Sequence, residues 1–196
     1  MSAMKDSENN LLMAIVVFML VCSSCSTQEP HERITGASGK LVRYSSQQIT
    51  VDMSDTQRNS VALLRDREFA AASSQQGINA AETALKVDGY AQVNAESDTG
   101  LIRAEKGEVL APKWRELLRG VLKSKIGILP AKPDHQMTMA MITVKEYGTG
   151  ILVRARFERT VWDNNGDSKT SVVMDEKIYT TFFSAFSQSL EGDRIK

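Results

Sequence analysis

The chain has 196 residues with 42% hydrophobic and 24% charged side chains, an ordinary globular composition whose length favours one domain over two. Its 24 Lys and Arg balance its 24 Asp and Glu, which argues against the positive field of a nucleic-acid-binding protein. The chain has only two cysteines and two histidines, which are too few for most zinc sites and for a framework of several disulfides. We therefore expect no metal and no cofactor.

An apolar run without any charge occupies residues 11–21. At about 1.5 Å per residue, such a helix covers roughly half of the ~30 Å hydrocarbon core, so it is too short to span a bilayer. Its length is typical of the hydrophobic part of a secretion signal. The alternative is a buried core helix, but that would carry polar neighbours at helical spacing, and this run has none.

Two serines precede Cys25, and this sequence resembles the lipobox of bacterial lipoproteins, in which the cysteine is acylated and begins the mature chain. Cys22 fits less well because bulky residues precede it. The resemblance implies a signal peptide over residues 1–24 and a membrane anchor through lipid on Cys25. It also places the protein in the bacterial cell envelope. Ser26 resembles the outer-membrane sorting pattern, with the domain facing the periplasm.

The spacing of Cys22 and Cys25 also fits a redox pair or half a metal site, but the chain has no second cysteine pair. Residues 25–40 are polar and contain one proline and two glycines, which indicates a flexible tether. A single domain is then expected over residues 41–196. Near the start of this domain, Ile49, Thr50 and Val51 are the residues most typical of a β-strand.

A helix is predicted over residues 66–88, because this segment is rich in alanine and repeats apolar residues at helical spacing. Gly77 leaves open a division into two helices. Gly89 then caps the C-terminus, and residues 90–95 and 101–106 form a hairpin.

Pro112 opens the next predicted helix, in the first position that proline favours. Its apolar stripe is the clearest amphipathic pattern in the chain and consists of Trp114, Leu117, Leu118, Val121 and Leu122. The charged side chains on its other face indicate a solvated surface.

Residues 137–145 and 151–162 alternate as two strands of an antiparallel hairpin. Residues 163–168 follow as an Asn-Gly turn; a calcium loop is the alternative, but Met174 stands where its final glutamate would be. A short strand is expected at residues 171–174. Asp175 then caps a terminal helix whose stripe is Ile178, Phe182, Ala185, Phe186 and Ser189.

This order predicts an α+β fold, with an antiparallel sheet of two hairpins and helices packed on one face. Trp114, Leu118 and Phe182 are expected to close the core. The pairs Ala84-Leu85 and Gly89-Tyr90, with the following segment 98–102, resemble the helix-grip modules of the C-subunit lipoprotein of the β-barrel assembly machinery. That resemblance implies a non-catalytic assembly role.

Common hydrolase, zincin and nucleotide motifs are absent from the sequence, and acidic residues present no specific catalytic pair. His31 falls in the tether and His135 in a predicted surface loop, so neither suggests a triad. We therefore expect a non-enzymatic envelope lipoprotein that acts as an interaction or assembly module. The alternative is a small periplasmic binding protein that holds an apolar or lipid-like ligand between helices and sheet.

The 137–162 hairpin also predicts a candidate partner-binding surface. The apolar set on each strand should face the helices, which turns Arg154, Arg156, Met139 and Met141 outward. Arg103 and Trp162 are expected to join them. Arginine, methionine and tryptophan are enriched in protein interfaces, so an envelope protein is the expected partner. The alternative is a solvated face whose methionines are covered by the N-terminal segment.

Overall fold

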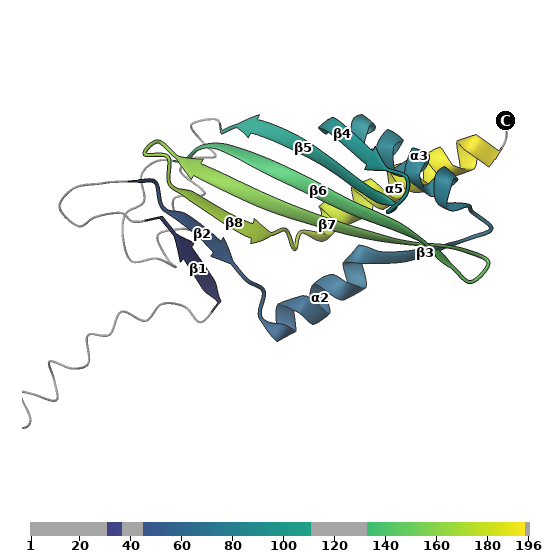
Figure 1. Ribbon diagram of the computed structural model, residues 1–196, viewed down its shortest axis with the longest axis horizontal. Helices are drawn as coiled ribbons and strands as arrows, with labels where there is room; N and C mark the ends of the chain where they lie inside the picture. The colour runs from purple at the N-terminus through teal and green to yellow at the C-terminus, as the bar shows by residue number, and fades with distance from the viewer. Residues whose placement is uncertain (1–30, 37–44, 111–132, 195–196) are drawn as a thin grey trace, which may run out of the picture. The chain divides into compact units, whose positions relative to one another are not determined.

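The computed structural model describes residues 31–36, 45–110 and 133–194 (Figure 1). In these ranges the chain forms three helices and an open, mostly antiparallel sheet of eight strands, which confirms the predicted α+β class. The signal segment, Cys25 and the predicted helix with Trp114 and Leu118 lie outside the described residues. None of the described helices is long and apolar enough to cross a membrane.

Two antiparallel hairpins form one half of the sheet, as predicted. Strand β4 (Ala91–Glu96) pairs with β5 (Leu101–Val109), and β6 (Pro133–Tyr147) pairs with β7 (Gly150–Asp163). Strand β5 also pairs with β6, so the hairpins are continuous. The expectation of a loop at His135 was wrong, because β6 starts at Pro133 and His135 pairs with Trp162.

The other half of the sheet joins segments that are distant in the sequence. Strand β8 (Ser168–Val172) pairs antiparallel with β7, and β2 (Gln48–Val51) pairs with β8 in parallel. Strand β1 (Glu32–Thr35) pairs antiparallel with β2. Since β1 belongs to the sheet, the flexible tether expected over residues 25–40 overlaps a strand.

The helix predicted over residues 66–88 is only partly correct. Residues Asp66–Ala70 form strand β3, which pairs antiparallel with the first part of β7, and helix α3 covers only Ser74–Val87. The open edge of β7 supplies backbone hydrogen bonds that outweigh the local helix propensity. Helix α2 (Asp55–Arg65) was not predicted from the sequence; it starts with a capping box between Ser54 and Gln57.

Helices α3 and α5 (Glu176–Arg194) pack side by side and cover one face of the sheet, which we call the inner face. Asp175 caps α5 as predicted, since its carboxylate accepts a hydrogen bond from the backbone N–H of Lys177. Gly77 does not divide α3. The inner face and the helices share a core of fully buried residues, including Ile102, Ala140, Ile142, Val153, Ala155, Phe157, Phe182, Phe183 and Phe186.

Candidate interaction surface

The opposite face of the sheet, which we call the outer face, carries the four candidate residues from the sequence. Strict alternation along β6 and β7 buries Ala140, Ile142, Val153 and Ala155 on the inner face, so Met139, Met141, Arg154 and Arg156 lie on the outer face as predicted. The buried residues of all three described helices pack with the inner face. No described helix therefore shares a core with these four residues.

The strand register arranges the outer face in rows across the sheet. Met141 lies between Arg103 of β5 and Arg156 of β7. Met139, one row away, lies between Glu105 and Glu158. Both methionines are half-buried, and the long side chains beside them contribute aliphatic cover. We call Met139, Met141, Arg154 and Arg156, with their neighbour Arg103, the outer patch.

Arg154 is held by a carboxylate on the neighbouring strand. Its Nε and one Nη donate hydrogen bonds of 2.8 Å each to the two oxygens of Asp66 on β3. This bidentate contact raises the pKa of the Arg154 guanidinium, chiefly through the hydrogen bond. Asp66 holds the Arg154 side chain in place and balances its charge. Arg154 therefore adds a guanidinium group in a fixed orientation to the patch, but little net positive charge.

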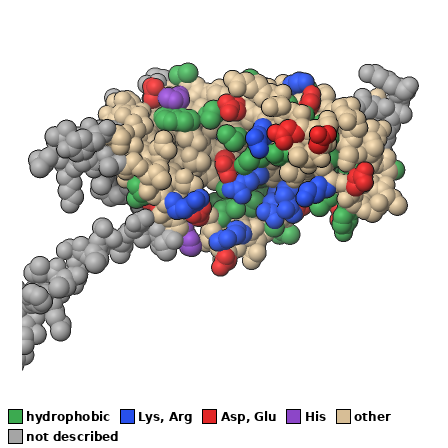
Figure 2. Space-filling view, in the orientation of Figure 1, with side chains coloured by type: hydrophobic (Ala, Val, Ile, Leu, Met, Phe, Trp, Pro, Cys, Tyr) green, Lys and Arg blue, Asp and Glu red, His purple; other side chains and the backbone are tan. Residues whose placement is uncertain are grey.

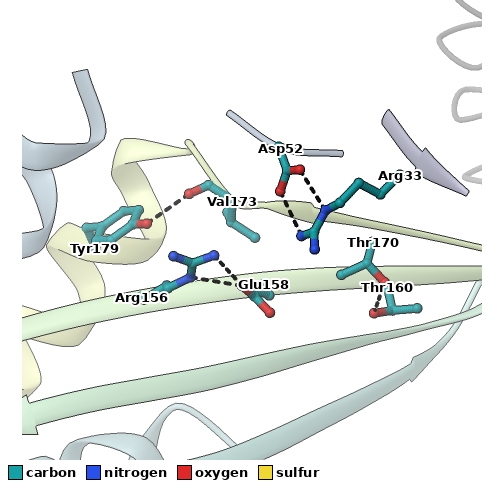
Figure 3. A network of polar contacts seen from close by, with 8 residues as sticks. All are labelled: Arg33, Asp52, Arg156, Glu158, Thr160, Thr170, Val173 and Tyr179. Carbon is teal, nitrogen blue, oxygen red and sulfur yellow. Dashed lines mark hydrogen bonds and ion pairs between the residues drawn. The ribbon is translucent and has the colours of Figure 1, made fainter. Parts of the chain in front are cut away.

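Arg156 is held within its own strand, as Figure 3 shows. Its Nε donates to Oε1 of Glu158 at 2.8 Å, and the two side chains lie next to each other on β7. Farther along the same face, the hydroxyls of Thr160 and Thr170 are 2.8 Å apart and join β7 to β8. In contrast, Arg103 is exposed and makes no ion pair with any residue in the described ranges.

An aromatic pair lies at the far end of the outer face. The rings of His135 and Trp162 stack in parallel, with centroids 4.9 Å apart and planes inclined by 10°. Val109 pairs with His135 in the register and is 83% exposed, so it extends this row with an apolar side chain. The sequence suggested Trp162 here but not His135, because its strand was expected to start later.

Figure 2 shows Lys and Arg side chains gathered near the middle of one view of the molecule, with acidic and hydrophobic side chains interspersed. Arginine and methionine, the residue types of the outer patch, are enriched in protein interfaces, whereas lysine, glutamate and aspartate are depleted there. Among the residues that the structure describes, no group of three or more His, Cys, Asp or Glu side chains could hold a metal ion.

The inner side has a small cavity of about 230 Å³ where α5 begins, and sequence reasoning missed it. Its lining is mostly charged or hydroxylic rather than apolar, and includes Tyr90, Lys106, Arg159 and Lys177. The sequence did contain one indication of this cavity. Every second residue of β7 points to the inner face, where Val153, Ala155 and Phe157 are buried, and the same alternation places the charged Arg159 on that face.

No protein-family model and no curated protein sequence matches this chain.

Proposed function

We propose that this protein is a non-enzymatic, lipid-anchored protein of the bacterial cell envelope that acts as an interaction or assembly module through its outer sheet face. The observation that carries the proposal is the division of the sheet into two unlike faces. The inner face shares one core with all described helices, whereas the outer face presents half-buried methionines framed by arginines and glutamates.

The partner that this surface suits is another envelope protein with apolar side chains at the centre of its contact surface and an acidic group at its edge. The apolar side chains would cover Met139 and Met141, and the acidic group would meet Arg103, which has no ion-pair partner among the described residues. Arg154 and Arg156 are already paired with Asp66 and Glu158, so they would bind through their planar faces and remaining N–H groups.

The alternative, an apolar or lipid-like ligand between helices and sheet, receives less support. The aromatic residues in that position fill the space by contacting one another: Phe157 packs edge-on against Tyr179 and Phe182, with ring centroids 5.2 and 5.9 Å apart. The cavity that remains at the end of this layer is lined mainly by polar groups.

Photo-crosslinking in cells tests the interaction surface directly. A photoreactive amino acid replaces Arg103, and the control carries it at Lys86, an exposed residue on α3 that pairs with Glu82. We expect one envelope protein to be crosslinked from position 103 and not from position 86. The double substitution Met139→Gln and Met141→Gln should reduce that product about tenfold or more, because it removes apolar contacts at the centre of the interface.

Cellular levels and circular dichroism of the double variant provide the folding control. If position 103 yields no discrete product, or if the methionine substitutions leave the product unchanged, the outer face is only a solvated surface.

A further inference from the structure

The cavity on the inner side lies at the junction of three parts of the fold. The segment that follows α3 contributes Asp88 and Tyr90, the strands contribute Lys106, Glu108, Thr138 and Arg159, and the start of α5 contributes Lys177, Ile178 and Thr181. Its volume of about 230 Å³ is below the range of about 300–1,000 Å³ typical of pockets for drug-sized ligands. A ligand of this cavity must therefore be small.

Arg159 is the residue of this cavity whose hydrogen bonding is incomplete. Its Nε is inaccessible to solvent and finds no hydrogen-bond partner among the residues that the structure describes. A buried donor without a partner costs roughly 1–3 kcal/mol, more when it is charged, so such groups in proteins generally have a ligand, an ion or water. Its cross-strand neighbour, Thr138, is a buried polar residue with a hydroxyl group.

Two other charges of the cavity, those of Lys106 and Asp88, compensate each other. The Lys106 ammonium donates to the backbone carbonyl of Asp88 at 2.8 Å and lies 3.7 Å from its carboxylate. Glu108 accepts a hydrogen bond of 2.7 Å from the neutral side-chain amide of Gln136 and keeps its negative charge. Lys177 is exposed and makes no ion pair within the described part of the chain. Among the described residues of the lining, Arg159 and Lys177 thus carry two positive charges against the single negative charge of Glu108.

Tyr90 adds a hydroxyl group and an apolar surface. The residue is 6% exposed, and burial, with the nearby Asp88 carboxylate, raises the pKa of its phenol well above the ordinary value. The phenol thus remains a neutral donor at physiological pH. Its ring and Ile178 form an apolar part of the lining that would contact a short aliphatic tail.

We propose that this cavity binds a small organic oxyanion, a molecule with one carboxylate or phosphate group and a short apolar part. The terminal N–H groups of Arg159 donate hydrogen bonds to the oxyanion, whereas its Nε stays buried, and Lys177 attracts the anion from the exposed side. Guanidinium groups match both carboxylate and phosphate through two parallel N–H donors, which explains why the two anion types share the site.

Titration calorimetry on the purified full-length protein tests this proposal, with inorganic phosphate and butyrate as separate probes. We expect at least one probe to bind at a single site, and Arg159→Met to weaken that binding about tenfold or more, since charge-assisted hydrogen bonds contribute roughly 1.5–3 kcal/mol. The matched control is Arg58→Met, which removes an exposed arginine of α2 that lines neither the cavity nor the outer patch. It should bind as the wild type does.

A second variant keeps the test decisive if Arg159→Met does not fold. Lys177 is exposed, so Lys177→Met should preserve the fold and weaken binding several-fold at low ionic strength. The proposal is wrong if neither probe binds in the millimolar range, which would leave only water beside Arg159. It is also wrong if the folded cavity variants bind like wild type. Because the cavity is on the inner side, neither result affects the crosslinking test of the outer face.

Discussion

Gly77 is a single residue on which the packing of helix against sheet depends. A Cβ added at this position would lie 2.5 Å from Cδ1 of Ile151 and 2.7 Å from Cγ1 of Val144, both on the inner face. Hydrogen at this position lets the α3 backbone approach the sheet. The glycine therefore has a packing role, although glycine is normally unfavourable inside a helix.

Replacing Gly77 with Ala should lower the free energy of unfolding by about 1 kcal/mol. Helix propensity favours alanine by about 1 kcal/mol, but the added methyl overpacks the core at a cost of about 1–3 kcal/mol. The control is Gly192→Ala near the end of α5, where an added Cβ meets nothing within 4 Å. Urea denaturation should show a loss for Gly77→Ala and none for Gly192→Ala; equal behaviour of the two variants would contradict the packing argument.

Strand β3 is the element whose placement depends most on its partner. It pairs along five positions with β7, from Asp66 opposite Arg154 to Ala70 opposite Gly150. On the inner face, Phe69 contacts Phe186, with ring centroids 4.7 Å apart. On the outer face, the ion pair of Asp66 and Arg154 holds the start of the strand. The residues of the outer patch lie on β5, β6 and β7, and β3 holds one of them, Arg154, in place.

Reversing the charge of Arg154 should weaken this pairing. Arg154→Glu places two carboxylates opposite each other, and both side chains are partly exposed, so we expect a loss of up to about 1 kcal/mol in the free energy of unfolding. Adding Asp66→Arg should restore part of that loss by forming the reversed pair. Urea denaturation of the wild type, both single variants and the double variant forms a complete cycle. Strictly additive effects would mean that the pair does not stabilise the sheet.

For the whole molecule, the proposed anchor at Cys25 determines where the domain can meet a partner. A single lipid-modified cysteine would keep the outer face within reach of other envelope proteins. Cys25 lies outside the described residues, and the anchor is inferred from the lipobox resemblance.

Metabolic labelling with radioactive palmitate tests the anchor. The wild type should be labelled, and Cys25→Ala should abolish both labelling and normal processing. Cys22→Ala is the matched control, since it removes the other cysteine three residues away and should leave labelling intact. Labelling that persists in Cys25→Ala, or that is lost in Cys22→Ala, would refute the assignment of the modified residue.

The sequence by itself determined which faces are buried. Alternation placed the inward and outward residues of β6 and β7 correctly, including Met139 and Arg156, because a strand buries every second side chain. The helical period of 3.6 residues likewise predicted that Phe182 and Phe186 of the terminal helix face the core. The predicted stripe did not include Phe183, which is also buried. These features are local, so a short window of sequence contains them.

Only the tertiary structure decided which distant segments meet. The parallel pairing of β2 with β8, the pairing of β3 with β7 and the contact of Arg154 with Asp66 each join residues that are tens of positions apart. The cavity around Arg159 likewise requires α3, three strands and α5 to converge. A periodic pattern shows that a segment must bury one side, but the identity of its partner depends on the packing of the entire core.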